Sequence, residues 1–198
     1  MITAHDYGVV YFDREPASGT ALDRARRNSS IEVSTPEMAP KQKDRELDVL
    51  VENTGRINFS HQLRGERKGI LKYAPPSGEP APANWQMFPL PMDDLATIRF
   101  KKKPCEGPCF YRATFSVDAP ADTFVDTSQL TKGQLWINGH AMGRFWNIGP
   151  QKTLYVPGPW LNKGRNEIVV FDVNGAMDHT VEGLAKPDLG PAGESGPD

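Results

Sequence analysis

The sequence of 198 residues carries 23 lysines and arginines against 25 aspartates and glutamates, which gives a formal net charge of -2. This balance argues against nucleic acid as the main partner, because phosphate binding requires a clustered basic face. The chain is also too short for a (β/α)8 barrel, which needs about 250 residues. The chain contains 18 glycines and 18 prolines. Together they make up a larger fraction of the residues than the usual share of about 12%. That composition favours many short strands and turns over long helices.

No stretch of the chain reaches the roughly 20 consecutive apolar residues of a membrane span, so no membrane partner is expected. Residues 1–7 contain neither the basic nor the apolar region of a secretory signal peptide, and we expect none. The two cysteines, Cys105 and Cys109, have no further cysteine or histidine nearby at a metal-binding spacing. The sequence therefore predicts no metal site, and it favours two free thiols over a small-loop disulfide.

The first half of the chain contains three predicted strands. Residues 8–12 are rich in β-branched and aromatic side chains, and residues 31–33 form a shorter segment of the same kind. The clearest alternation of apolar and charged residues, at 46–52, predicts a strand with one apolar face. That face consists of Leu47, Val49 and Val51.

The second half consists of predicted strands and turns. Residues 110–117 alternate in polarity, and residues 134–137 lead into Asn138-Gly139, the strongest short hairpin signal in a sequence. Residues 167–173 are apolar on both faces, which predicts a central strand covered from both sides. Nowhere does an apolar period of 3.6 residues persist beyond two helical turns. The fold class predicted from these patterns is an all-β, antiparallel β-sandwich.

A domain boundary is predicted where prolines and glycines interrupt the strand pattern. Residues 74–82 hold five of them in nine positions, which excludes regular structure there. After residue 176 apolar side chains become rare, as in a poorly ordered tail. The predicted organisation is a partial first β-sandwich at 1–73, a proline-rich linker at 74–84, a second β domain at 85–175 and a tail at 176–198.

The predicted hairpin has a specific register. A two-residue turn places Ile137 opposite His140 and Leu135 opposite Met142. A sandwich core does not bury a polar side chain such as His140 beside Leu135 without partners. Gly143 is therefore predicted to mark a β-bulge that redirects the strand, and this leaves open which faces the residues beyond it occupy.

Aromatic rings and planar polar groups gather around this hairpin, and sugar recognition uses both. A pyranose has an apolar C–H face that stacks on a ring and hydroxyl groups that bind planar polar side chains. The alternative is that the tryptophans and Phe145 pack in the core or between domains while Arg144 bonds backbone carbonyls, and the residue pattern alone favours this alternative. The candidate sugar-binding residues are Trp136, His140, Arg144, Trp146, Asn147, Gln151 and Trp160.

Catalytic motifs are scarce in the sequence. Retaining glycoside hydrolysis needs two carboxylates about 5–5.5 Å apart, and no acidic pair is singled out by its surroundings. Ser60 and His61 lack the G-x-S-x-G turn that would support nucleophilic catalysis. No phosphate-binding loop or dinucleotide fingerprint occurs, so no cofactor is predicted. The residues predict no catalytic site in this chain.

Residues 132–140, 143–151, 154–157, 160–161, 164 and 166–171, in this order, resemble the C-terminal jelly roll of the glycoside hydrolase family 35 β-galactosidases. The match is long and ordered, and it is far more specific than one short motif. Together with the earlier segments it covers about residues 5 to 173. The earlier segments that agree are 47–53, 55–59, 68–70 and 85–90.

The resemblance implies a galactose-binding-like jelly roll at 85–175, preceded by a partial β-sandwich unit. Family members carry both catalytic glutamates, the proton donor and the nucleophile, on a (β/α)8 barrel, and nothing in this sequence corresponds to that barrel. The resemblance thus implies an accessory region that is not an enzyme by itself, although the parent family consists of retaining hydrolases. The implied partners are galactose-containing glycans and the catalytic barrel of a parent enzyme. The implied location is secreted, periplasmic or otherwise extracytoplasmic.

Three functions stay open at this stage. The first is a non-catalytic, carbohydrate-binding accessory region of a β-galactosidase. The second is a structural brace whose aromatic residues face the barrel and bind no sugar. The third is a fragment that is known only by the β-galactoside hydrolase activity of its parent. The exposure of Trp136, Trp146 and Trp160 discriminates between the first two.

Overall fold

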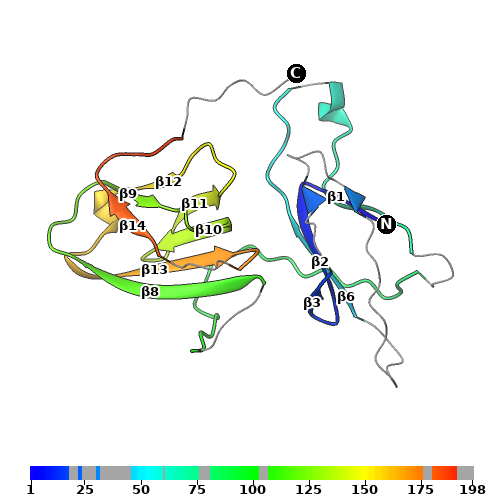
Figure 1. The fold of residues 1–198 in the computed structure, drawn as a ribbon, viewed down its shortest axis with the longest axis horizontal. Coiled ribbons are helices and arrows are strands. Elements are labelled where there is room, and N and C mark those ends of the chain that lie inside the picture. The colour runs from blue at the N-terminus through cyan, green and yellow to red at the C-terminus, as the bar shows by residue number, and fades with distance from the viewer. Residues whose placement is uncertain are drawn as a thin grey trace. The chain divides into compact units, whose positions relative to one another are not determined.

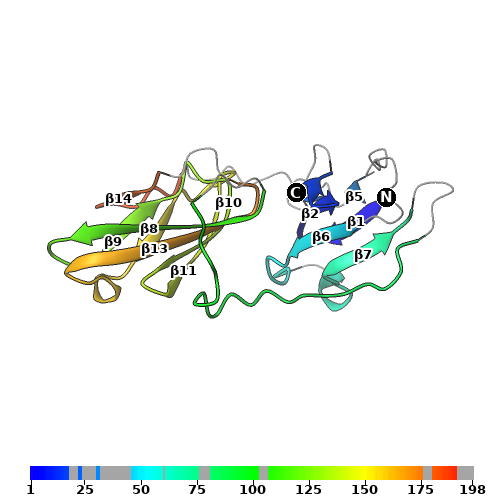
Figure 2. The ribbon, with the colours of Figure 1, turned by 90° about the horizontal axis from the view of Figure 1, so that it is seen from below.

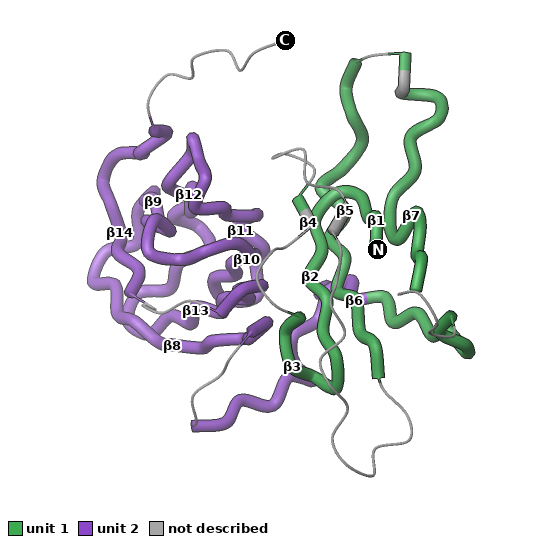
Figure 3. Tube along the Cα trace, turned by 45° about the vertical axis from the view of Figure 1, so that its right-hand side comes forward, with its two compact units in different colours: residues 1–89 green, residues 90–198 purple. Residues whose placement is uncertain are grey.

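The computed structural model describes residues 1–17, 22–23, 30–31, 46–59, 61–75, 81–102, 107–175 and 180–190. The chain separates into two compact units, residues 1–89 and 90–198 (Figure 3). Strands dominate both units, and the described residues contain no α-helix and only short 3-10 helices at His61–Arg64 and Gly158–Trp160. No helix in this part of the chain has the length and apolar character to cross a membrane. The predicted all-β fold is confirmed.

The first unit is built from short antiparallel strands. One sheet has the order β5-β1-β7, and in a second sheet β2 pairs with β3, β4 and β6. The predicted apolar face of β6 is confirmed, because its three apolar side chains pack on the small core formed by Ile2, Ala4 and Val10. The strands are β1 (Ile2–His5), β2 (Tyr7–Phe12), β3 (Glu15–Pro16), β4 (Leu22–Asp23), β5 (Ser30–Ile31), β6 (Leu47–Glu52) and β7 (Gly69–Tyr73).

The second unit is a sandwich of two antiparallel sheets. Their strand orders are β11-β10-β13-β8 and β12-β9-β14, and in Figure 1 the sheet that carries β8 and β13 lies below β9 and β14. Apolar side chains from both sheets, including Leu135, Val170 and Leu154, form one buried core between them. The strands are β8 (Cys109–Val117), β9 (Thr123–Asp126), β10 (Lys132–Ile137), β11 (His140–Trp146), β12 (Thr153–Val156), β13 (Gly164–Asp172) and β14 (Glu182–Leu184).

Strand β13 is the central strand that the sequence predicts. It pairs with β8 along its whole length and with β10 on its other edge, as Figure 2 shows. Ile168 and Val170 belong to the core between the sheets, whereas Phe171 lies on the opposite face against Phe110, with ring centroids 4.6 Å apart. The predicted antiparallel β-sandwich is therefore confirmed for the second unit, and an all-β unit precedes it.

The predicted hairpin forms between β10 and β11. Asn138 and Gly139 have positive φ angles of 48° and 81°, as a type I′ turn requires at both central positions. Ile137 pairs with His140 as predicted, but Leu135 pairs with Gly143 rather than with Met142. The register shifts before that point, so Met142 is the extra residue of a β-bulge. The predicted bulge is confirmed, and the Leu135–Met142 pairing is wrong.

The prediction of two free thiols is also wrong, because Cys109 is disulfide-bonded. Cys105, the other cysteine of the chain, lies outside the described residues. Gly107 has a φ of 78°, and Pro108 follows it, so the chain turns sharply immediately before Cys109. The spacing of the two cysteines alone does not indicate the disulfide.

Candidate functional site

The predicted sugar-binding residues do not form one cluster, and the most exposed aromatic contact among them is at the turn of the β10–β11 hairpin. There the imidazole of His140 stacks on the indole of Trp160, with ring centroids 4.5 Å apart and planes 13° apart. Trp160 ends the 3-10 helix that follows β12, and its side chain keeps 37% of its surface exposed. We call His140 and Trp160 the hairpin-end pair.

The segment that carries Trp160 is held by a buried asparagine, Asn166, which is only 1% exposed. Its Oδ1 accepts hydrogen bonds from the Asn162 backbone N–H at 2.7 Å and from Asn138 Nδ2 at 2.8 Å. Its Nδ2 donates to the carbonyls of Asn162 and Gly164, both at 2.9 Å. The amide is thus satisfied on both sides, as a buried polar group must be, and it fixes the loop between β12 and β13.

Asn138 connects this loop to the hairpin turn. Its Nδ2 donates to the Trp160 carbonyl at 2.8 Å, and its Oδ1 accepts the backbone N–H of Glu167 at 2.9 Å. Asn138 tolerates its positive φ because asparagine visits the left-handed region readily. The same residue therefore shapes the turn before His140 and holds the backbone of Trp160, which fixes the hairpin-end pair in place.

A second group of candidates lies at the opposite end of β11. Trp146 is half-buried, and the ammonium of Lys132 lies 4.4 Å from the centroid of its indole ring. Because of the bulge, Arg144 and Trp146 pair with Gln134 and Lys132 on the face of the sheet that points away from the core, while Phe145 points into it. A cation over the ring is a favourable contact, and Lys132 occupies one face of this indole.

The two remaining polar candidates follow this strand and are exposed. The Asn147 backbone accepts a hydrogen bond from Lys152 Nζ at 2.7 Å, and its N–H donates to the Thr131 carbonyl at 2.7 Å. Gln151 Nε2 donates to the Thr153 carbonyl at 2.6 Å. We call Arg144, Trp146, Asn147 and Gln151 the strand-end group.

Trp136 belongs to neither set, because it is only 3% exposed. Its ring lies 6.4 Å from that of Phe110 on β8. The hairpin-end pair and the strand-end group are separated as well: His140 and Trp146 lie six residues apart on one strand, or about 20 Å at the usual rise per residue. One sugar ring does not span that distance. The structure thus offers two separate candidate surfaces.

Sequence reasoning missed another exposed aromatic residue of the second unit, Tyr155, which is 48% exposed. Its ring packs on that of Phe124, with centroids 5.6 Å apart, and its hydroxyl bonds to the carboxylate of Asp122. A signal was present in the sequence: Leu154 and Val156 point into the core, so the residue between them must point outwards.

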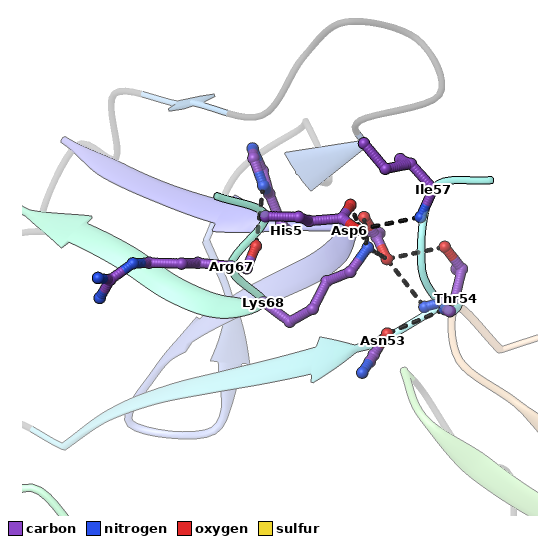
Figure 4. Close-up of polar contacts among 9 residues, drawn as sticks. His5, Asp6, Asn53, Thr54, Ile57, Arg67 and Lys68 are labelled. Atoms are coloured by element: carbon purple, nitrogen blue, oxygen red, sulfur yellow. Dashed lines mark hydrogen bonds and ion pairs between the residues drawn. The ribbon is translucent and has the colours of Figure 1, made fainter. Parts of the chain in front are cut away.

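The first unit contains a compact polar cluster around Asp6 (Figure 4). Lys68 Nζ donates to both carboxylate oxygens of Asp6, at 2.8 and 2.7 Å, and forms an ion pair with Glu66 at 2.9 Å. Thr54 donates to Asp6 through its backbone N–H and its hydroxyl, and the Ile57 N–H donates to Glu66. Partial burial alone would lower the pKa of Lys68, but the hydrogen bonds to the two carboxylates outweigh it and raise that pKa.

This cluster has a structural role. Its two carboxylates already accept bonds from an ammonium group and from backbone N–H groups, and in Figure 4 these bonds connect the end of β1 to the segment that begins at Asn53. In the described part of the chain no group of three or more His, Cys, Asp or Glu side chains is arranged to hold a metal ion.

Comparison with known families adds to this geometry. The model described as "Beta-galactosidase, first all-beta domain" matches residues 1–91, and the model described as "Beta-galactosidase, galactose-binding domain" matches residues 108–166. The chain belongs to the β-galactosidase family. The resemblance to the galactose-binding-like jelly roll of the family 35 β-galactosidases is therefore confirmed.

Curated β-galactosidase relatives agree with this assignment. "Beta-galactosidase 1" of Dictyostelium discoideum is 38% identical over 184 residues, which cover 85% of this chain and 27% of the relative. "Beta-galactosidase" of Xanthomonas manihotis is 38% identical over 76% of this chain and 24% of its own length. "Beta-galactosidase-1-like protein 3" of Homo sapiens is 34% identical over 86% and 29%. The chain thus spans about a quarter of the length of these β-galactosidases.

Proposed function

We propose that this chain is a non-catalytic accessory region of a β-galactosidase that binds galactose-containing glycans. The matched family models are described as an all-β domain and a galactose-binding domain, and most of the length of the relatives lies outside the matched region. The carboxylates of Asp6 and Glu66 are both paired with Lys68 and do not offer a free acid and nucleophile.

The observation that carries sugar binding is the hairpin-end pair. Trp160 presents an exposed indole whose orientation is fixed by stacking on His140 and by the asparagine network beneath it. The apolar C–H face of galactose stacks on the indole, and the exposed imidazole nitrogens of His140 bond to its hydroxyls. Because these groups are already ordered, little conformational entropy is lost on binding.

The expected affinity is low, because one ring and a few exposed hydrogen bonds stabilise a complex only modestly. We expect dissociation constants from millimolar to tens of micromolar, or roughly 4 to 6 kcal/mol. Galactose and lactose should be titrated into the chain while tryptophan fluorescence and heat are recorded. Trp160→Ala should abolish the response.

Trp146→Ala is the matched control, since Trp146 is the aromatic residue of the strand-end group. If Trp146→Ala abolishes binding and Trp160→Ala does not, the sugar-binding surface is the strand-end group with Arg144 and Asn147. If neither sugar gives a response with the unmodified chain, carbohydrate binding is excluded. The chain would then have only a structural role in the parent enzyme.

A structural brace is the second candidate function, and an exposed apolar segment favours it. Met87 and Phe88 are 90% and 74% exposed, and Trp85 and Leu90 next to them are also exposed. Large apolar side chains that gather on a surface mark interaction sites. Trp85 is anchored edge-on against Tyr73, with centroids 6.0 Å apart, so the segment is fixed at one end.

The partner that we propose for this segment is the catalytic barrel of a parent β-galactosidase. A tagged form of the chain should co-purify with the separately expressed barrel portion of such an enzyme, and Phe88→Asp should abolish this association. Ile148→Asp, which alters another exposed apolar residue, is the matched control and should leave it intact. Equal retention by both variants would contradict the brace.

A further inference from the structure

The sheet β12-β9-β14 presents an aromatic ring and a carboxylate side by side on its outer face. We propose that Tyr155 and Asp122 form a second sugar-binding surface, separate from the hairpin-end pair, which takes a neutral pyranose ring. This inference rests on the carbohydrate-binding function proposed above. We call these two residues the Tyr155–Asp122 surface.

The ring of Tyr155 is exposed and supported. Tyr155 lies on the edge strand β12 directly opposite Phe124 of β9, which in turn lies opposite Leu184 of β14. The Phe124 ring contacts the Tyr155 ring at an interplanar angle of 51°, while nearly half of the Tyr155 side chain stays exposed. The ring is therefore held in one place with surface left for stacking.

The carboxylate of Asp122 lies beside this ring and can accept further hydrogen bonds. Its Oδ1 accepts the Gly158 backbone N–H at 2.8 Å, and its carboxylate also accepts the Tyr155 hydroxyl. The bond from Gly158, followed by that from Tyr155, lowers the pKa of Asp122, so the group is ionised at neutral pH. A carboxylate has about four acceptor positions, which leaves two for the hydroxyls of a sugar.

The two side chains are fixed relative to each other by a close backbone contact. A Cβ on Gly158 would come within 2.9 Å of the Ala121 backbone, so the start of the 3-10 helix lies tightly against the residue before Asp122. Asp122 thus bonds at the same time to the strand that carries Tyr155 and to the helix that ends in Trp160. A ligand would find the ring and the carboxylate already in position.

The charge of this face selects among sugars. Asp126 and Glu182 are register partners, and Asp126 lies on the same face of β9 as Phe124, two residues away. With Asp122 they give this face three carboxylates. An anionic sugar would be repelled, so the surface suits a neutral pyranose whose adjacent hydroxyls donate to Asp122.

The test is an amide NMR titration of the full chain with methyl β-galactoside. We expect two sets of shifted amide signals, one from residues 122–124 and 155–158 and one from residues 138–140 and 160. Tyr155→Ala should remove the first set and leave the second. Trp160→Ala should remove the second set and leave the first. Asp122→Asn should weaken binding at the first set about tenfold, because a charge-assisted hydrogen bond is lost.

Two further comparisons sharpen the result. Tyr155→Phe keeps the ring and loses only the hydroxyl bond, so the first set of shifts should persist at reduced affinity. Galacturonate in place of the neutral probe should leave the first set unshifted. The dispersion of the amide signals reports whether each variant is folded, and Tyr155→Phe keeps the test decisive if Asp122→Asn fails to fold.

Failure of this inference and failure of the proposed function have different signatures. If only the hairpin-end amides shift, the Tyr155–Asp122 surface is excluded while carbohydrate binding stands. If Tyr155→Ala and Trp160→Ala each remove both sets, the chain has one site and the proposed second surface is wrong. If no amide shifts at millimolar probe, both proposals are overturned.

Discussion

The imidazole of His140 and the indole of Trp160 stack almost parallel, 13° apart, although His140 lies on a strand of one sheet and Trp160 lies in the 3-10 helix that follows the other sheet's strand β12. His140 begins β11, and Trp160 follows β12. Their contact brings an exposed aromatic ring and a polar ring together at one end of the second unit.

Asn166→Ala should destabilise the second unit by about 2–3 kcal/mol, because it leaves buried backbone groups of the loop without partners. Urea unfolding followed by circular dichroism measures this. Asn162→Ala is the matched control: Asn162 contributes only its backbone to the network, so that variant should stay within about 0.5 kcal/mol. A similar loss from both variants would show that the side-chain network contributes little.

Lys68→Met should destabilise the first unit by about 3 kcal/mol, since it leaves two largely buried carboxylates without their cation. The mostly exposed Lys72 provides the control variant Lys72→Met, which should be close to neutral. Thermal unfolding of both variants tests this. Equal melting temperatures for the two would contradict a stabilising role for the Asp6 cluster.

The same cluster predicts a pH dependence. The pKa of Lys68 is raised in the folded chain, so its contribution to stability is complete below the unfolded value of about 10.4. It is lost as the pH rises through the folded pKa. The difference in unfolding free energy between the unmodified chain and Lys68→Met should therefore shrink above pH of about 10.4. A difference that stays constant throughout the alkaline range would refute this.

Tyr11 should ionise late in an alkaline titration. Burial, with a smaller contribution from Tyr7, raises the pKa of Tyr11 to about 12, so folding loses stability as the pH passes from the unfolded value of about 10 towards 12. The ultraviolet absorbance of the phenolates should show a late phase that Tyr11→Phe removes. Tyr155→Phe is the comparison variant, because the hydrogen bond to Asp122 raises the pKa of Tyr155 as well.

The chain should not hydrolyse a chromogenic β-galactoside. It spans about a quarter of the length of its relatives, and no catalytic residue is proposed in it. The measurement is product absorbance across the fractions of a size-exclusion column, with an intact β-galactosidase as positive control. Turnover that co-elutes with the pure chain would refute the non-catalytic assignment.

Local signals in the sequence predicted local structure well. The Asn138-Gly139 turn follows from the backbone freedom of two adjacent residues, and the apolar face of β6 follows from simple alternation. The exact pairing of Leu135 did not follow, because one extra residue in the opposite strand shifts the register without changing the composition. Such a shift depends on which position of the strand fits the core.

The candidate site was harder to predict, because its geometry depends on residues far apart in the chain. Trp136 is buried beside Phe110, 26 positions away in sequence, and nothing near Trp136 indicates this. The stacking of His140 on Trp160 depends on how the two sheets meet. Sequence reasoning therefore found several of the side chains near the hairpin and did not find how they are grouped.

The bulge at Met142 also determines how this hairpin should be aligned with other sequences. Downstream of it, Phe145 faces the core and Trp146 faces away. Removing one residue there would exchange the two, placing a half-covered indole in the interior and a phenyl ring outside. A relative with a one-residue gap at this point would present a different set of side chains to solvent, even where its sequence is otherwise the same. The position of gaps in an alignment of this hairpin should therefore be checked before residues of the strand-end group are compared.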